Sequence, residues 1–270
     1  MKSGICKMCL LKKDLVSSHL IPASLYDYLR HGNATPIRVG DGVIFPTDRE
    51  TQDYLLCLDC EDILNKGGES WVNSKLCTVE RKFPLYDFVA SGPVAAEDPD
   101  GALYFAAQNP LIDVHKLVHF GLGIFWKAAV HSWKGNTTEP MIELGPYCEP
   151  VRTWLKGESD FPKWMFLWVT LSRPHRVQLT LNVPVPTART GWKTFHTHML
   201  GLTFMLNVGK GVPLETRESC FRDNPDHPIL VSEGVTAILE KRHMEQYWES
   251  RKTHAYFKRY GGSPGNKSPA

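Results

Sequence analysis

The stretch "ICKMCLLKKDL", residues 5–15, carries two cysteines separated by two residues, and "LLCLDCEDIL", residues 55–64, repeats this spacing. A Cys-x-x-Cys turn directs two thiolates at one ion, and two such turns complete a tetrahedral four-cysteine zinc site. The alternative is two chance pairs of buried cysteines, because free cysteine is often buried. We predict one structural zinc, Zn²⁺, held by four ligands: Cys6, Cys9, Cys57 and Cys60.

The other cysteines and the N-terminal sequence fit a metal-binding protein better than a disulfide scaffold. The first fifteen residues contain no long apolar segment of the kind that secretory signals carry. We therefore expect a reduced, cytoplasmic protein. Cys77, Cys148 and Cys220 have no partner at metal-ligand spacing, so we expect them in the core.

Composition indicates a globular chain with one large domain or two smaller ones. The 270 residues are 42% hydrophobic, which is enough for a sizeable core. The formal net charge is only +2, so the chain is not a strongly cationic nucleic-acid binder. The most apolar long segment, residues 114–130, is interrupted by lysines and histidines, which favours a buried helix over a membrane span.

The pattern along the chain predicts an α+β protein in two parts. Residues 1–82 hold both cysteine pairs and form a small zinc module, and residues 83–260 form a larger α+β domain with its own core. The last ten residues, "GGSPGNKSPA", are expected to be a disordered tail, 261–270. Apolar periodicity predicts helices over 22–30, 110–130, 149–157 and 234–260, and a further helix from the second cysteine pair to Gly67 and Gly68. Branched and aromatic runs predict strands over 163–171, 176–183 and 198–209, and a turn at Asp41-Gly42 within 37–45.

Three short stretches in the zinc module carry a resemblance to a known family. "CKMC", then "SSHLIP" at residues 17–22, then "YLLCLDCEDILN" at residues 54–65, resemble the HNH endonucleases. In that family a zinc-bound treble clef carries a ββα-metal catalytic unit. The chain is also similar to a group of bacterial proteins with C-x2-C, SH-x2-P and LLC-x2-CE, and its "FGLGIFWKAAV" followed by "IELG" is similar to theirs. The resemblance implies metal-dependent cleavage of DNA phosphodiesters, in defence against foreign DNA.

By position, His19 matches the general base of the HNH enzymes, which takes a proton from the attacking water. Mg²⁺ or Mn²⁺ on the phosphate would stabilise the leaving oxygen. The other signature positions differ: Ser18 stands where the family has an acidic residue, and Gln52 where it has asparagine. The alternative for His19 is a core histidine that is hydrogen-bonded to a backbone carbonyl.

Glu61 stands where the family has a metal-binding histidine. Because a hard ion prefers oxygen ligands, we predict that Glu61 and Asn65 bind the catalytic Mg²⁺. Glu69 would join them on one helical face only if the helix continued past the two glycines. A solvated helix face is the alternative for Glu61.

Charge leaves the partner open. Residues 1–82 contain 11 Lys plus Arg and 11 Asp plus Glu, whereas phosphate binding usually rests on an excess of cations. A cationic surface for DNA would come from the segment 240–260, through Lys241, Arg242, Arg251, Lys252, Lys258 and Arg259. That segment is alternatively an ordinary amphipathic helix. The competing function is a non-catalytic zinc module with a decayed HNH site, which binds a protein or a nucleic acid.

Two histidine pairs have weaker metal-binding patterns. His115 and His119 share a helical face, and His196 and His198 share one side of a strand. Each pair lacks a third ligand, so we expect both pairs to be core histidines.

Overall fold

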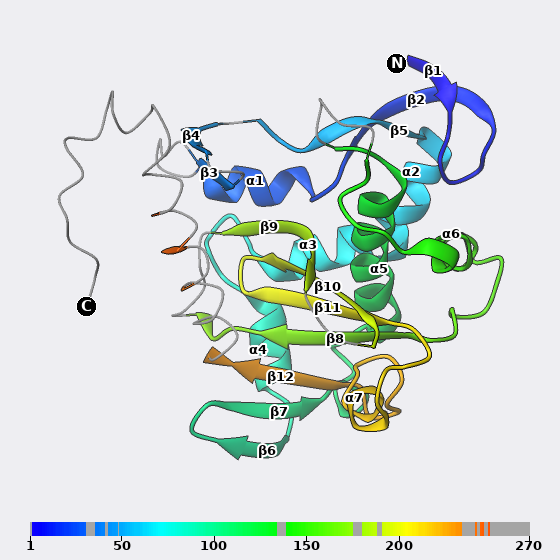
Figure 1. Ribbon diagram of the computed structural model, residues 1–270. Coiled ribbons are helices and arrows are strands. Elements are labelled where there is room, and N and C mark those ends of the chain that lie inside the picture. The colour runs from blue at the N-terminus through cyan, green and yellow to red at the C-terminus, as the bar shows by residue number, and fades with distance from the viewer. Residues whose placement is uncertain are drawn as a thin grey trace.

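Three sheets and the helices between them make up the fold of this α+β chain (Figure 1). The computed structural model describes residues 2–30, 36–40, 43–47, 49–133, 139–174, 180–187 and 191–233, together with 241, 244, 245 and 248. The expected disordered tail and most of the expected C-terminal helix lie outside these residues. Residues 41 and 42 of the expected turn also lie outside them.

A three-stranded antiparallel sheet holds the cysteine pairs, in the order β1 (Lys2–Ile5), β2 (Lys12–His19) and β5 (Gln52–Cys57). The first Cys-x-x-Cys stretch lies in the turn between β1 and β2, so the same residues that could bind a metal also connect the two strands of the hairpin. The expected helix at 22–30 is confirmed as α1 (Ala23–Leu29), and the expected hairpin around 37–45 consists of β3 (Ile37–Gly40) and β4 (Val43–Pro46).

The sequence predicted that the helix after β5 would end at its two glycines. This prediction is wrong, because the helix continues past them. It runs from α2 (Leu58–Leu64) through a π-helical turn, η2 (Asn65–Glu69), into α3 (Ser70–Leu76). The glycines are there because another helix crosses at that point. A Cβ on Gly68 would lie 2.3 Å from the carbonyl oxygen of Lys116, so only glycine permits this approach.

The second sheet has seven strands in the order β6-β7-β12-β8-β11-β10-β9 and is antiparallel except between β12 and β8. Its strands are β6 (Val94–Asp98), β7 (Gly101–Phe105), β8 (Met165–Leu171), β9 (Leu181–Thr187), β10 (Lys193–Met199), β11 (Leu202–Val208) and β12 (Pro228–Ser232). The remaining helices are α4 (Pro84–Ala90), η3 (Ala106–Gln108), α5 (Val114–Val130), η4 (Gly145–Tyr147), α6 (Cys148–Leu155) and α7 (Leu214–Glu218).

The single strand predicted over 198–209 is wrong, because two strands meet there. β10 ends at Met199, which pairs with Leu202, and the chain reverses at Leu200 and Gly201. Both turn residues have positive φ, +48° and +94°, as tight two-residue hairpin turns require. The leucine hid the turn, since it is apolar and buried. The strand expected at 163–171 is confirmed as β8, and the one expected at 176–183 begins at Leu181 as far as it is described.

The predicted long apolar helix is confirmed as α5, and it lies between the zinc module and the large sheet (Figure 1). On one side it packs on η2 through Gly68, and on another side Gly121 packs on the ring of Phe204 of β11, which a Cβ on Gly121 would approach to 2.9 Å. Buried side chains from both sides of residue 82 consequently form one continuous core cluster. The division into two separate domains at residue 82 stays a prediction.

Gly68→Ala should destabilise the protein by about 1–3 kcal/mol, the usual cost of forcing extra volume into a packed contact. Gly123→Ala on α5 is the matched control, because its new Cβ would meet only Leu64 Cδ2, at an ordinary 3.7 Å. This control should be neutral or slightly stabilising, as for most replacements of glycine within helices. Urea denaturation followed by circular dichroism measures both changes. Equal effects of the two substitutions would contradict the proposed reason for Gly68.

A fragment that begins at Lys82 tests the domain boundary. It would keep α5 but would expose the face of α5 that packs on η2, and with it the buried side chain of Phe120. We expect this fragment to bind hydrophobic dyes and to melt without a sharp transition. If it melts as cooperatively as the full chain, residues 83 onward are an independent domain after all.

Candidate functional site

The sequence-predicted zinc ligands come together at one end of the three-stranded sheet. Cys6 and Cys9 lie in the β1–β2 turn, Cys57 ends β5, and Cys60 lies in the first turn of α2. Their four sulfur atoms all lie within 4.8 Å of one another, and Cys9 Sγ is 3.9 Å from Cys57 Sγ. A tetrahedron with metal–sulfur bonds of about 2.3 Å has edges of about 3.8 Å, so these cysteines can hold a metal ion, consistent with structural zinc.

Backbone amides support this cluster. The Leu10 amide donates to the Cys6 carbonyl at 2.9 Å, and Leu10 has a φ of +62°, which fixes the tight turn. The Cys57 amide donates to Cys6 Sγ at 3.4 Å. Burial raises the pKa of the Cys6 thiol, but amide hydrogen bonds outweigh it and lower the pKa to about 7. Burial, with the nearby Cys6 sulfur, raises the pKa of Cys60, so a bound cation is needed before all four thiols can ionise together.

The first cysteine turn is also held from the other side of the chain. Arg152 on α6 donates a hydrogen bond from Nη1 to the carbonyl oxygen of Met8, and its Nη2 pairs with Glu149 at 2.5 Å. Met8 is fully buried. The cysteine cluster is therefore packed against the part of the chain that follows residue 82.

His19 lies at the end of β2, and its imidazole is partly exposed. Its Nε2 atom is 2.6 Å from Oε2 of Glu50, and Oε1 of Glu50 accepts a hydrogen bond from Arg30 Nη2 at 2.8 Å. Gln52 faces His19 in the strand register, but its Oε1 accepts from the hydroxyl of Ser17. Glu50, which the sequence did not indicate, is thus the acidic partner of His19.

Ser18 and Glu61 are joined directly to each other. The Ser18 hydroxyl donates to Glu61 Oε2 at 2.7 Å, and Ser18 is completely buried. Burial raises the pKa of Glu61, although Lys127 and Ser18 partly oppose that effect. Glu61 is therefore a half-buried, hydrogen-bonded carboxyl group and does not lie on a solvated helix face.

The expected magnesium ligands Glu61 and Asn65 find no support in this arrangement. Asn65 is exposed on η2, and the second carboxylate near Glu61 is that of Glu69. The extra residue of the π-helical turn changes the helical phase, which brings Glu69 toward Glu61. Among the described residues, the four cysteines form the one group of three or more ligand atoms that could hold a metal ion.

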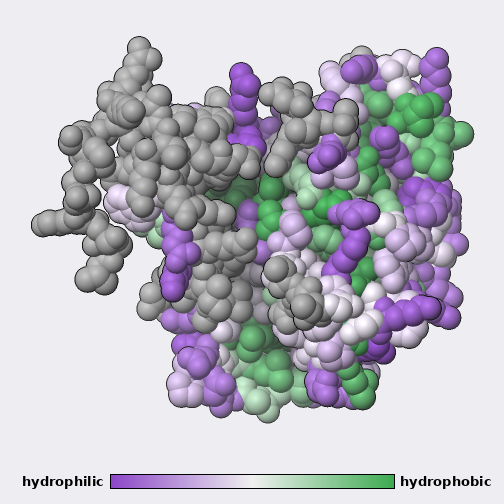
Figure 2. Space-filling view, viewed as in Figure 1, coloured by the Kyte–Doolittle hydropathy of each residue, from purple (hydrophilic) through white to green (hydrophobic). Residues whose placement is uncertain are grey.

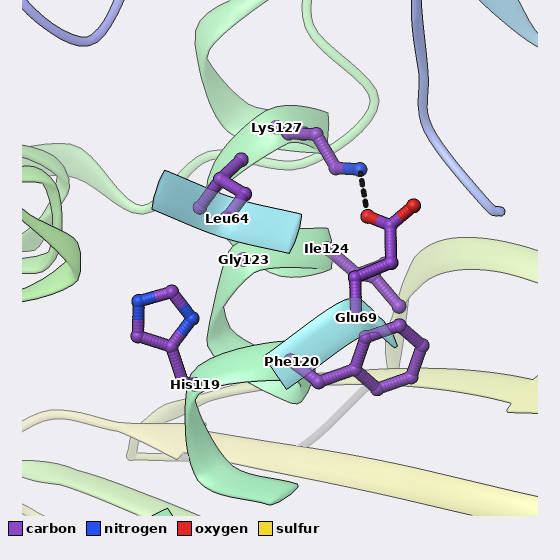
Figure 3. Close-up of a pocket in the computed structure, with 7 residues that line it drawn as sticks. All are labelled: Leu64, Glu69, His119, Phe120, Gly123, Ile124 and Lys127. Carbon is purple, nitrogen blue, oxygen red and sulfur yellow. Dashed lines mark ion pairs between the residues drawn. The ribbon is translucent and has the colours of Figure 1, made fainter. Parts of the chain in front are cut away.

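Lys127 of α5 enters the same region, and the sequence did not indicate a role for it. Its side chain is 3% exposed, its Nζ donates to the backbone carbonyl of His19 at 2.6 Å, and Nζ lies 3.7 Å from Glu69 Oε2. Figure 3 shows this lysine and Glu69 reaching toward each other, while the ring of His119 lies away from the pair. Glu61 is hydrogen-bonded to Ser18, and Glu69 is paired with the Lys127 ammonium. These two carboxylates therefore do not form a site that fits Mg²⁺.

Three of the four histidines expected in the core are buried, but the expectation is wrong for His115. His115 is exposed, whereas His119 is buried, with Nε2 3.0 Å from the Leu155 carbonyl oxygen, and burial lowers its pKa. His196 and His198 are buried, and their Nδ1 atoms hydrogen-bond to Thr187 and Thr203. Of the three cysteines expected in the core, Cys220 is fully buried, and Cys77 and Cys148 are half-buried.

Comparison with known proteins returned no match: no family model, no curated protein and no solved structure is similar to this chain. Within the part that the structure describes, none of the helices has the length and apolar character that crossing a membrane requires. The cationic positions expected between 240 and 260 fall outside that part, apart from Lys241.

The metal centre can be tested by elemental analysis of protein purified without added metal, which should contain about one zinc per chain. Cys57→Ser should lose this zinc and lower the melting temperature, because metal binding supplies folding free energy. Cys77→Ser is the matched control, since Cys77 lies outside the cluster, and should keep the zinc. A folded wild-type protein without zinc would end the assignment.

Proposed function

We propose that this chain is an HNH-type nuclease that hydrolyses DNA phosphodiesters, with His19 as its general base. The observation that carries the proposal is the pairing of His19 with Glu50, at the end of β2 that lies away from the four-cysteine cluster. A partly exposed imidazole held by a carboxylate is the usual arrangement of a base that activates a nucleophile. The order of a cysteine turn in a hairpin, a strand, and a second cysteine turn opening a helix also supports a treble clef.

The chain's own residues suggest how the base would work. When His19 donates its Nε2 proton to Glu50, its Nδ1 atom keeps a lone pair and can accept a proton from water. Arg30 holds Glu50 from the opposite side, so the carboxylate keeps the imidazole oriented. The proton taken from water would leave an imidazolium, which the Glu50 carboxylate stabilises by charge.

Zinc would have a structural task in this proposal. All four ligands are cysteines, which leaves no open coordination position for water or substrate. The zinc would fix the end of β5 and the start of α2, and so the distance between His19 and Glu61. A role in defence against foreign DNA rests on the resemblance to bacterial proteins alone.

A second candidate function is a zinc module that binds a partner without catalysis. Four apolar side chains around the cysteine turns are exposed: Ile5, Leu10, Leu11 and Leu58, at 54%, 55%, 57% and 69%. Figure 2 shows a hydrophobic area at the upper right, where Figure 1 has the β1–β2 turn. Exposed apolar groups gathered in this way are typical of interaction surfaces. Lys7 and Lys12 are exposed beside them, which favours an acidic partner.

Cleavage assays separate the two functions. Plasmid, linear and single-stranded DNA should be incubated with the zinc-loaded protein, with added Mg²⁺, with Mn²⁺ and without either ion. His19→Ala should lower the cleavage rate roughly 10²-fold or more, the usual contribution of a general base. The zinc content and melting temperature should stay near those of the wild type.

His115→Ala is the matched control, because His115 is an exposed histidine on α5. It should cleave at the wild-type rate. A stable, fully active His19→Ala protein would remove His19 from the mechanism. A wild type that binds DNA or a protein but cleaves none of the substrates would favour the binding module.

A further inference from the structure

Lys127 is a buried cation on α5, where the other buried residues are apolar except His119. Burying an ammonium costs much free energy unless opposite charges and hydrogen bonds compensate it. Among the described residues, its compensation comes from residues 1–82: the His19 carbonyl at 2.6 Å, Glu69 at 3.7 Å, and the charge of Glu61 nearby. The lysine is therefore the counter-charge of this pair of carboxylates.

The end of α5 is fixed where it delivers this charge. The Trp133 indole donates from Nε1 to the Lys127 carbonyl at 2.9 Å, and His131 Nε2 lies 2.9 Å from Asp53 Oδ2 on β5. Gly68 lets α5 approach η2 closely further along the helix. The part of α5 that carries the ammonium is thus held at two places, by these contacts at its end and by its close approach to η2.

The ligands that a divalent ion would need are already engaged. Mg²⁺ requires octahedral oxygen coordination, usually with one or two carboxylates. Here Glu61 Oε2 accepts a hydrogen bond from the Ser18 hydroxyl. Because Ser18 is neutral, it supplies no further carboxylate for the ion. Glu50 is bound by Arg30 and His19. A divalent ion between Glu61 and Glu69 would also face the positive charge of Lys127 at close range.

We propose that the Lys127 ammonium takes the place of the divalent cation expected for an HNH-type site, so that this site binds no Mg²⁺ or Mn²⁺. The proposal rests on the proposed function, because only an HNH-type site would be expected to bind a divalent ion here. Its test measures Mn²⁺ binding and does not depend on nuclease activity. Lys127 acts as a positioning residue, since it holds the strand end that bears His19 and neutralises the carboxylates beside it.

Binding of Mn²⁺ to zinc-loaded protein tests the proposal without reference to activity. Titration calorimetry and the melting temperature should show no Mn²⁺ binding to the wild type at millimolar concentration. Lys127→Met keeps the apolar stem and removes the charge, so the two carboxylates are left uncompensated. This variant should melt at a lower temperature, bind about one Mn²⁺ per chain, and regain stability when the ion is added.

Two further variants locate the effect. Lys116→Met on the same helix removes a half-exposed lysine that pairs with Asp113 at 3.5 Å, and it should show no Mn²⁺ response. The double variant Lys127→Met with Glu61→Gln should lose the Mn²⁺ response of the single variant. These results would place the ion at the position that the ammonium normally occupies.

The proposal has clear contrary outcomes. Wild-type protein that binds Mn²⁺, with binding abolished by Glu61→Gln, would overturn it, and this measurement stands even if Lys127→Met does not fold. A folded Lys127→Met protein that binds no Mn²⁺ would also overturn it. If the wild type cleaves no DNA under any condition, the nuclease proposal fails, while the Mn²⁺ results still decide the role of Lys127.

Discussion

The close packing of α5 on the glycine turn of η2 is the contact on which the arrangement of the site depends. A side chain at Gly68 would collide with the backbone of α5, so the two helices can meet only because that side chain is absent. Their contact brings Lys127 beside the carboxylates of the zinc module and joins the two halves of the chain in one core. Without it, the His19 carbonyl and the Glu69 carboxylate would lack the ammonium of Lys127.

The cysteine cluster imposes the second constraint, which is local. It joins a hairpin turn to the start of a helix, within a segment whose buried residues share one core cluster with the rest of the chain. Because Ser18 and Glu61 extend from the two elements that the cysteines join, their hydrogen bond depends on the same frame. The cysteine cluster and the Ser18–Glu61 pair are thus positioned by the same elements.

How far the sequence predicts this structure depends on whether an interaction leaves a recognisable pattern in it. The two Cys-x-x-Cys pairs form a known metal-ligand motif although they lie 48 residues apart, and the apolar period of α5 is a local pattern; the cysteine cluster and the helix are both found in the structure. The glycine pair was misread as a helix end because its reason, the crossing of α5, lies about 50 residues away in the chain. Lys127 could not be placed, since its hydrogen bond to His19 spans 108 residues.

The turn at Leu200 was missed for a different reason. A leucine with positive φ is uncommon, and only pairing between β10 and β11 makes this conformation favourable. Glu50 gave no signal either, because a lone glutamate in a loop matches no motif. The residues that complete the site are therefore those that tertiary contacts select.

Residues 1–82 depend on Lys127, which belongs to α5 and lies outside them. This dependence limits how far they can be transferred to another protein. Many small metal-binding domains are self-contained and can be joined to unrelated partners by a linker. Residues 1–82 instead receive a buried charge from α5, and Arg152 of α6 holds their first cysteine turn. A recombinant that joined residues 1–82 to another protein would leave Glu61 and Glu69 without the charge of Lys127.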